Sequence, residues 1–483
     1  MPPIIYARRQ PEKTVLYQAV LTSWLSLASQ CDSSDWPLPS YVEKEVEAYI
    51  RCGILSYGFA RIHCGDCGHD RLVAFSCKGR NWCPSCGGRF MAEKAAHLVD
   101  NVLPKAPYRQ WVLTLPPPLR YMLAYDSALC SDVLGCFWKA VCGWLKHKAK
   151  KEFGLTSLKQ AHPGGITVIQ RCGSALNLNI HYHLVATDGV FIQTSSESTP
   201  VFRALPAPTD AEVAQVAWET CQRTLAILRK QGRFFDEDIS DDKLAQEEPA
   251  LAAFANASIK GTLVLGPRSG KRVVRFHGVA AKNADQVVTM QTPGYGFNLH
   301  AKRRVSAHDH KGFERLCRYI LRPPIANDRL SRLSNGKISL ELKRPWSDGT
   351  THIIFTDEEL MEKLISLIFP PRFNRLRYHG VFAPRAKLRE EITPKHEEEP
   401  SCGHDSDHND QEQHVNQSRR IEWARLLARV FQIDVEKCPK CGSRMQRIAF
   451  ITQGDVIKKI LNCVGLPADS PQLRPPPQLS LAL

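Results

Sequence analysis

The feature that most constrains how this chain folds is a mainly apolar stretch from Leu176 to Gly189, which carries two histidines two residues apart. Its alternating pattern predicts a β-strand, because successive strand side chains point to opposite faces of a sheet. One face is then apolar, and the other presents Asn179, His181 and His183. Two imidazoles side by side on a rigid strand suit a divalent metal ion. The stretch therefore predicts a metal site on one face of a sheet.

A second histidine pair lacks this context. Polar Asp309 separates His308 from His310, and no apolar strand pattern surrounds them. We interpret these two as solvated side chains. By contrast, the residues 165–171 predict a strand that pairs antiparallel with the histidine strand across a short loop. Gln170 lies on it and either offers its amide oxygen beside the imidazoles or is a surface glutamine; both interpretations stay open.

The composition narrows the class of partner. With 483 residues the chain is long enough for two or three domains, and its net charge of +15 favours a polyanion. We find neither a run of about 18 apolar residues nor a signal-peptide core, so nucleic acid is a better candidate than a membrane surface. Seventeen cysteines, several of them in C-x-x-C pairs, favour structural zinc in a reducing cytoplasm over disulfides.

Two C-x-x-C pairs lie ahead of residue 90, and they are Cys64 with Cys67 and Cys83 with Cys86. Their spacing allows a short hairpin to bring four thiolates around one tetrahedral ion, which predicts a zinc site. Cys52 and Cys77 exceed the needs of that ion. We interpret them as buried thiols, with a second ion as the alternative.

A third pair, Cys438 and Cys441, follows near the end of the chain. One C-x-x-C pair supplies half of a zinc site. Cys463, Cys402 or nearby histidines are candidates for the other half, and the sequence does not choose among them.

The residues from Phe313 to Arg322 predict a helix that ends before two prolines. Tyr319 falls outside the apolar stripe of this helix. Arg315, four residues earlier, and Arg322, three residues later, share its side of the helix. Cationic neighbours lower the pKa of a phenol and bind phosphate, which an attacking tyrosine requires. The alternative is a tyrosine at the edge of the core, with its arginines in solvent.

Positive charge is concentrated in two segments. Residues 266–346 carry many more basic than acidic side chains, and the residues 372–389 contain no acid. Short strands are predicted over 258–265, 272–279 and 286–292. Such a basic, strand-rich region suits a nucleic-acid groove, although a solvated surface can also be basic. The candidate DNA-binding residues are Arg303, Arg304, Arg318, Arg375, Arg377 and Lys387.

Several ordered blocks of this sequence resemble the rolling-circle insertion-sequence transposases of the HUH superfamily, of the IS91 type. These blocks are Phe75–Cys86, Leu176–Gly189, Arg315–Pro324, Tyr378–Pro384, and Cys438–Cys441 followed by Ile448–Ile451. The resemblance extends from about residue 14 to 466 and implies an α+β fold. In it, a HUH-endonuclease antiparallel sheet is flanked by helices, with an N-terminal zinc-binding module and a small C-terminal C-x-x-C unit.

The same resemblance implies roles for individual residues. His181 and His183 become the ligand pair for Mg²⁺ or Mn²⁺, with Gln170 as the candidate third ligand, and Tyr319 becomes the nucleophile. Founding members carry two tyrosines four residues apart, whereas Arg315 stands four residues before Tyr319 here. The chain is similar to the single-tyrosine, common-region subgroup, which puts in doubt a scheme with two alternating nucleophiles.

The expected function is therefore transposition by cutting and rejoining single-stranded DNA through a 5′-phosphotyrosine, with Arg315 and Arg322 stabilising the transition state. The alternatives are a replication initiator or relaxase of the same superfamily, and a non-catalytic zinc-dependent DNA-binding protein. The expected partners are single-stranded DNA at the element ends, target DNA and, as an open option, a second copy in a homodimer. No membrane partner is expected, and the expected location is the prokaryotic cytoplasm, on DNA.

The expected division of the chain follows the composition. It runs as N-terminal helices in 1–50, a zinc-binding and DNA-binding module in 51–103, a catalytic domain in 104–390, an acidic linker in 391–418, and a C-terminal helical and C-x-x-C unit with a disordered tail in 419–483. Predicted helices cover 12–30, 41–51, 88–103, 120–152, 209–231, 357–368 and 419–431.

Overall fold

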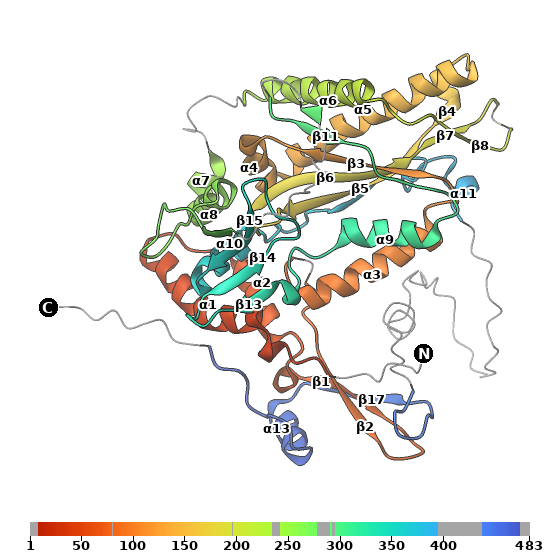
Figure 1. Cartoon of the computed structure of the whole chain (residues 1–483). Helices are drawn as coiled ribbons and strands as arrows, with labels where there is room; N and C mark the ends of the chain where they lie inside the picture. Colours follow the sequence, from red (N-terminus) through yellow and green to blue (C-terminus); the bar gives the residue numbers. More distant parts are fainter. Residues whose placement is uncertain are drawn as a thin grey trace.

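The computed structural model of the chain describes residues 8–79, 81–195, 197–233, 242–277, 290–291, 295–394 and 437–473. Its centre is a seven-stranded antiparallel sheet with helices on both faces (Figure 1). The strand order is β10-β11-β3-β6-β5-β16, and β12 also pairs with β3. These strands are β3 (Tyr108–Thr114), β5 (Gly164–Cys172), β6 (Leu178–Thr187), β10 (Met290–Gln291), β11 (Asn298–His300), β12 (Arg304–Val305) and β16 (Leu376–Gly380). This arrangement confirms the predicted α+β class.

Different helices cover the two faces of this sheet (Figure 1). One face packs against α4 (Pro117–Tyr125), α5 (Ser127–Phe153) and α6 (Asp210–Lys230). The other face packs against α3 (Pro84–Asn101) and α9 (His310–Leu321). Strand β6 separates these two cores, because its alternate side chains point into one or the other.

Helix α5 is long and apolar enough, by length and composition alone, to cross a membrane. The sequence alone did not predict a membrane-spanning segment here. Its apolar side chains contribute to the core against β6 and α6, with Phe137 and Leu145 fully or almost fully buried. The apolar composition of α5 is thus accounted for by packing within the domain.

Two smaller antiparallel sheets flank the central one. Four strands run in the order β13-β14-β15-β9, and three run in the order β4-β7-β8. Helices α1, α2 and α10 join the first of these sheets in a common core with Trp82 and Cys83. The bounds are β13 (Leu330–Arg332), β14 (Ile338–Glu341), β15 (Thr350–Phe355), β9 (Val274–His277), β4 (Ala161–His162), β7 (Gly189–Ile192), β8 (Val201–Ala204), α1 (Val15–Ser33), α2 (Ser40–Arg51) and α10 (Asp357–Ser366).

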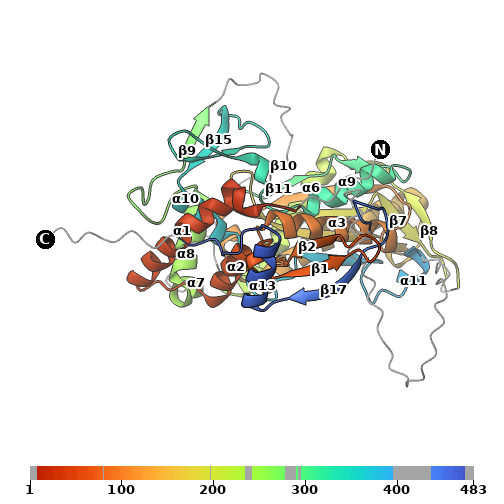
Figure 2. The same cartoon turned by 90° about the horizontal axis from the view of Figure 1, so that it is seen from below.

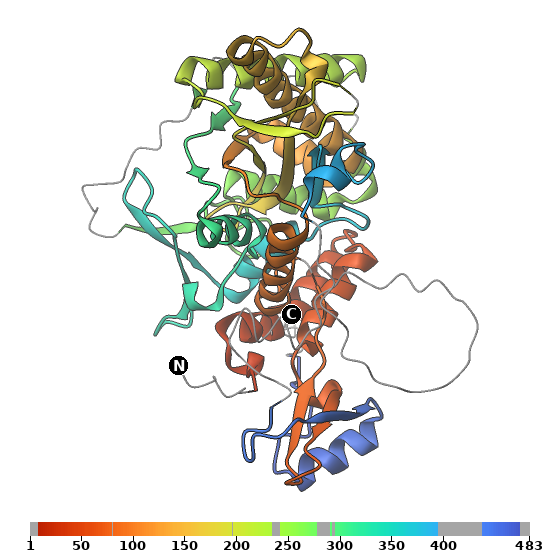
Figure 3. The ribbon, with the colours of Figure 1, turned by 90° about the vertical axis from the view of Figure 1, so that its right-hand side faces the viewer.

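The last sheet joins the two ends of the chain. Strand β17 (Gln446–Ile451) pairs antiparallel with β1 (Phe59–His63), which also pairs with β2 (Asp70–Ala74). Figures 2 and 3 show these strands side by side, with α13 (Gly454–Cys463) beside them. The zinc module and the C-terminal unit, which we expected as separate parts, therefore share one sheet. The remaining elements are α7 (Lys243–Glu247), α8 (Pro249–Lys260), α11 (Arg389–Ile392) and the 3-10 helices η1 (Pro11–Lys13), η2 (Leu55–Tyr57), η3 (Leu158–Gln160) and η4 (Asn327–Arg329).

Most predicted elements are confirmed, and two are wrong. The stretch 258–265 begins inside α8, which starts with Pro249 and ends at Gly261 in a left-handed conformation, so the predicted strand is a helix end and a loop. The helix predicted over 120–152 is two helices, because Asp126 interrupts it. The Asp126 carboxylate accepts a hydrogen bond from the N–H of Leu129 and so caps the start of α5. Strands predicted over 272–279 and 286–292 contain β9 and β10. The helix predicted over 419–431 lies outside the described residues.

A buried ion pair closes the end of the central sheet. Asp188, directly after β6, accepts two hydrogen bonds from the Arg109 guanidinium of β3, at 2.7 and 3.1 Å. Arg304 of β12 donates to the same carboxylate at 2.7 Å. Asp188 and Arg109 have only 4% and 6% of their side-chain surfaces exposed, whereas Arg304 is half exposed. One carboxylate thus holds three strands in register.

Replacing Asp188→Asn should lower the free energy of unfolding by about 3 kcal/mol, because it leaves the Arg109 charge buried without its partner. Urea denaturation of the full chain, followed by circular dichroism, measures the change. Arg304→Gln is the matched control and should cost about 1 kcal/mol or less, since half of this side chain is exposed to solvent. Equal, small losses in both variants would contradict the assigned role of Asp188.

Candidate active site and cysteine centres

The two faces of β6 are as unlike as the sequence predicts. Leu178, Ile180, Tyr182 and Leu184 are fully buried on the side of α5. His181 and His183 lie on the opposite face, with their ring centroids 4.9 Å apart. Across the sheet, His181 stands opposite Gln170 of β5 and Thr114 of β3. The strand therefore presents a histidine pair toward the α3 and α9 side of the sheet.

The backbone sets the tautomer of His181. Its Nδ1 lies 2.7 Å from the carbonyl oxygen of Asn179, which can only accept a hydrogen bond. The proton is therefore on Nδ1, and Nε2 keeps its lone pair. Burial, reinforced by the charges of Arg120 and Arg322, lowers the pKa of His181 to about 4. The ring is neutral near pH 7, the state in which imidazole binds a metal.

His183 is positioned by a side chain instead. Its Nδ1 lies 2.8 Å from the amide of Gln110, on β3, and its Nε2 is buried without a hydrogen-bond partner among the described residues. A half-turn of the amide exchanges its oxygen and nitrogen at this contact, and the oxygen then accepts the Nδ1 proton. Burial holds the pKa of His183 well below 6.5, and nearby His181 lowers it further. A neutral imidazole with an unpartnered buried nitrogen fits a metal ligand.

Gln170 connects the histidine strand to the helix of Tyr319. Its amide nitrogen donates to the carbonyl oxygen of Ile320 at 2.6 Å. Because that carbonyl belongs to the last turn of α9, it has no partner within the helix. The amide oxygen of Gln170 is thereby turned away from Ile320. Gln170 is almost fully buried, so it is not a surface glutamine, and its oxygen remains a candidate metal ligand.

Tyr319 stands over this face of the sheet. Helix α9 buries Phe313, Leu316, Cys317 and Ile320, as predicted, which leaves the ring of Tyr319 off the stripe and 37% exposed. Its ring meets His183 edge to face, with the centroids 5.8 Å apart. The structure therefore brings the predicted nucleophile and the predicted ligand pair into one site.

The arginines around Tyr319 differ in part from the prediction. Arg322 stacks on the ring with its Cζ 4.4 Å from the centroid, and Arg303 does so at 5.3 Å. Arg315 is exposed one helical turn away, and no contact of its side chain with the ring is among those the structure describes. Arg303, predicted only as a DNA-binding residue, is thus the second cation at the phenol.

The other candidate DNA-binding residues lie in varied settings. Arg304 pairs with Asp188, and Arg318 pairs with Glu314 at 2.7 Å. The remaining three are Arg375, which stacks on Phe369, Arg377, which donates to Ser131, and Lys387, which is exposed. In the register of β16 on β5, Arg377 pairs with Thr167 and so shares the face of β6 that lies opposite the histidines. The structure therefore does not gather these five residues at the candidate site, and their role in DNA binding stays a prediction.

The cysteines are paired differently from our expectation. Cys52, Cys77, Cys83 and Cys86 form the first cysteine cluster, and Cys64, Cys67, Cys438 and Cys441 form the second, with the four Sγ atoms of each within 4.8 Å of one another. The prediction that Cys64, Cys67, Cys83 and Cys86 surround one ion is wrong, because the hairpin β1–β2 points its C-x-x-C turn away from α3. Cys52 and Cys77 are also not isolated buried thiols. Both clusters have the sulfur donors that zinc prefers.

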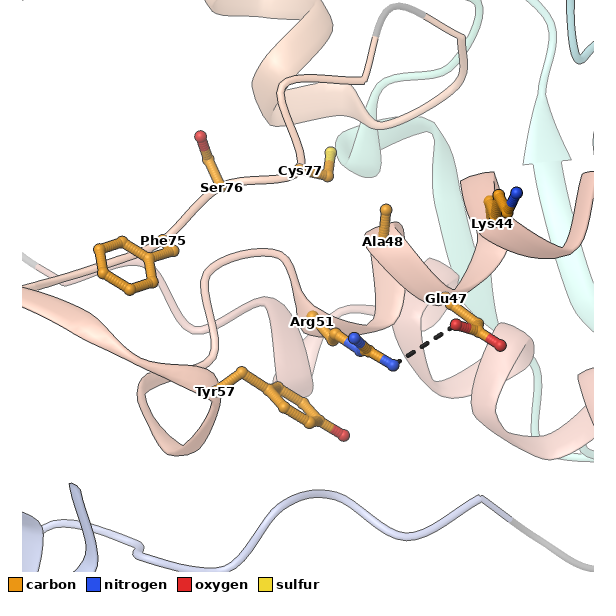
Figure 4. A pocket seen from close by; sticks show the side chains of 8 residues that line it. All are labelled: Lys44, Glu47, Ala48, Arg51, Tyr57, Phe75, Ser76 and Cys77. Atoms are coloured by element: carbon orange, nitrogen blue, oxygen red, sulfur yellow. Dashed lines mark hydrogen bonds and ion pairs between the residues drawn. The ribbon is translucent and has the colours of Figure 1, made fainter. Parts of the chain in front are cut away.

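The first cysteine cluster adjoins a surface hollow of about 410 Å³. Figure 4 shows its lining, which includes Cys77 together with Arg51, Tyr57 and Phe75. Arg51 forms an ion pair with Glu47, one turn earlier on α2, at 3.4 Å. None of the lining residues belongs to the site around Tyr319. The hollow is therefore a feature of the zinc module and not of the candidate active site.

Comparison with known proteins identifies the class. Residues 164–391 match a family model described as "Putative transposase", and residues 26–115 match one described as "Transposase zinc-binding domain", of the IS91 type. A relative from Pseudomonas savastanoi pv. phaseolicola, "Transposase for insertion sequence element IS801", is 21% identical over 416 residues, which cover 84% of this chain and 83% of the relative. No solved structure matches the chain.

These matches define the chain as a transposase, a class of protein that acts on DNA. More closely, it is an IS91-type transposase. The zinc-binding match and the cysteine clusters together support structural zinc.

Two residues of the site are not predicted from the sequence. Gln110 lies on β3, two residues before Val112, which the register places opposite His183. Its alternation with Val112 and Thr114 shows that it shares the histidine face, but only the order β3-β6 reveals this. Arg303 was noticed for its charge, yet nothing in the sequence links it to Tyr319.

Proposed function

We propose that this transposase cuts and rejoins single-stranded DNA in rolling-circle transposition, with Tyr319 as the attacking nucleophile. The observation that carries the proposal is the edge-to-face contact between Tyr319 and His183, at 5.8 Å between centroids. A tyrosine that merely closed a core edge would not need two guanidiniums on its ring and a histidine pair beneath it. Arg322 and Arg303 supply these cations.

His181, His183 and Gln170 are the residues that would hold a Mg²⁺ or Mn²⁺ ion. When bound, such an ion polarises a phosphate oxygen and stabilises charge at phosphorus. The bare Nε2 of His183 and the turned amide oxygen of Gln170 support this ligand set. An amide carbonyl oxygen suits both ions, and imidazole nitrogen is a common ligand of divalent metal ions.

The chemistry is a transesterification. The phenolic oxygen of Tyr319 attacks the scissile phosphorus, the bond from phosphorus to the 3′-oxygen breaks, and a 5′-phosphotyrosine and a 3′-hydroxyl result. The phenolic proton is lost to water, and the departing 3′-oxygen takes one up. Arg322 and Arg303 stabilise the added negative charge in the transition state. Attack by a later 3′-hydroxyl reverses the step without ATP, because the covalent bond retains the phosphodiester energy.

The substrates proposed are single-stranded element ends and target DNA in the prokaryotic cytoplasm. The chain has one tyrosine on α9, since Arg315 and Pro323 occupy the positions four residues away. Each chain thus makes one covalent bond at a time. Cutting and joining then proceed in successive rounds or between two copies, which is compatible with a homodimer.

Tyr319→Phe should abolish covalent attachment to single-stranded terminal DNA and reduce cleavage by about a thousandfold or more, because it removes the attacking oxygen. Denaturing gels of reactions with 5′- or 3′-labelled strands in Mn²⁺ provide the measurement, and the adduct should contain the 3′ fragment. Tyr295→Phe is the matched control, since Tyr295 is equally exposed at 38% but lies outside the site. Unchanged cleavage by Tyr319→Phe would refute the proposal.

Gln110→Leu should weaken Mn²⁺ binding by about tenfold or more, since a hydrogen-bond partner that orients a ligand histidine typically contributes this much. Leucine has a similar size but cannot hold the His183 ring. Manganese titration of the zinc-loaded protein, followed by electron paramagnetic resonance, provides the measurement. Gln110→Glu keeps an oxygen that can accept the hydrogen bond from Nδ1 of His183. This variant should bind Mn²⁺ at least as well as the wild type. Wild-type affinity in the leucine variant would show that Gln110 does not position His183.

A further inference from the structure

We propose that Cys64, Cys67, Cys438 and Cys441, the second cysteine cluster, hold a zinc ion of their own that closes the two ends of the chain into one unit. Each end supplies one C-x-x-C pair, so neither end alone completes the site. The zinc-binding family match stops at residue 115 and therefore contains only half of these ligands. The inference does not depend on the cleavage chemistry.

The sulfur positions fit a tetrahedral ion. Sγ of Cys64 lies 3.5 Å from Sγ of Cys441, and Sγ of Cys67 lies 3.5 Å from Sγ of Cys438. Four sulfurs at the usual Zn–S bond length of about 2.3 Å define tetrahedron edges of about 3.8 Å. The first cysteine cluster shows similar separations, from 3.4 to 3.8 Å. The four thiols are thus gathered closely enough to bind one ion without rearrangement of the backbone.

The two C-x-x-C turns have the same backbone conformation. In the first turn the N–H of Gly68 donates to the carbonyl of Cys64 at 3.0 Å, and in the second Gly442 does the same to Cys438 at 3.0 Å. Both glycines have left-handed φ angles, of 69° and 81°. Two further bonds match, from Cys64 N–H to His69 O at 2.9 Å and from Cys438 N–H to Ser443 O at 2.8 Å. Two equal turns facing each other are the usual way in which paired C-x-x-C motifs enclose zinc.

The site lies where the chain ends need a crosslink. Cys64 directly follows β1, whose last residue His63 pairs with Gln446 of β17. The apolar cluster beside the thiols is small, with Ile62 and Met445 as its buried side chains outside the cysteines. A second small cluster, with Leu55, Phe59, Ile457 and Leu461 buried, lies at the other end of β17. Units with cores as small as these two usually depend on a metal or disulfide crosslink. Zinc at the second cysteine cluster would supply that crosslink.

The two clusters differ in exposure. In the second, Cys67 and Cys441 are exposed, whereas in the first three thiols are buried and Cys77 is half-buried. A chelator therefore reaches the second ion more easily. Once that ion is removed, β17 can detach from β1, while the ion in the first cysteine cluster and the central sheet stay in place.

The test is a metal count on full-length protein purified under reducing conditions. Mass spectrometry of released metal should give two zinc ions per chain for the wild type and one for Cys438→Ser/Cys441→Ser. Cys463→Ser is the matched control, because Cys463 is an exposed thiol on α13 outside both clusters, and it should retain two ions. Amide hydrogen exchange across β17 should accelerate by tenfold or more in the double variant alone.

Two results would overturn the proposal. One is a single zinc ion per wild-type chain. This result includes the case in which the second cysteine cluster forms disulfides under reducing conditions and so binds no zinc. The other is a double variant that still binds two ions, or one that loses an ion while β17 exchanges as slowly as in the wild type.

Discussion

One hydrogen bond joins the two halves of the candidate site. The Gln170 amide donates to the carbonyl oxygen of Ile320, the residue that follows Tyr319. Gln170 also stands opposite His181 in the pairing of β5 with β6. The strand register and a helix end are thus connected through a single buried side chain. Since a helix carbonyl in the last turn needs an external partner, the same bond ends α9 and sets the position of its tyrosine.

A second contact relates the zinc module to this helix end. Gly87, next to Cys86 in the first turn of α3, approaches Pro323 so closely that an added Cβ would lie 2.8 Å from the proline Cβ. Pro323 follows Arg322, whose guanidinium stacks on Tyr319. The first cysteine cluster therefore anchors α3 where it supports the end of α9. Zinc in that cluster would thus help to fix the end of α9, next to Tyr319.

The sequence predicts those parts of the site that depend on local periodicity. The two-residue period separates His181 and His183 from Leu178 and Ile180, and the helical period separates Tyr319 from its buried stripe. What it cannot show are contacts between elements distant in the chain. The spacing of Cys64 to Cys86 suggested one ion, but the backbone turns direct these pairs to different partners, one of them near residue 440. Gln110 and Arg303 likewise reach the site only through the order of strands in the sheet.

The nucleophile is identified most directly by locating the DNA on the protein. After reaction with terminal single-stranded DNA in Mn²⁺ and digestion with nuclease and trypsin, mass spectrometry reads the modified peptide. Tyr319 begins the tryptic peptide that ends at Arg329, because the bond before Pro323 resists trypsin. We expect a nucleotide linked through its 5′ phosphate to Tyr319, as the proposed role of this residue as the nucleophile requires. A nucleotide on any other tyrosine, or cleaved strands with no modified peptide, would contradict it.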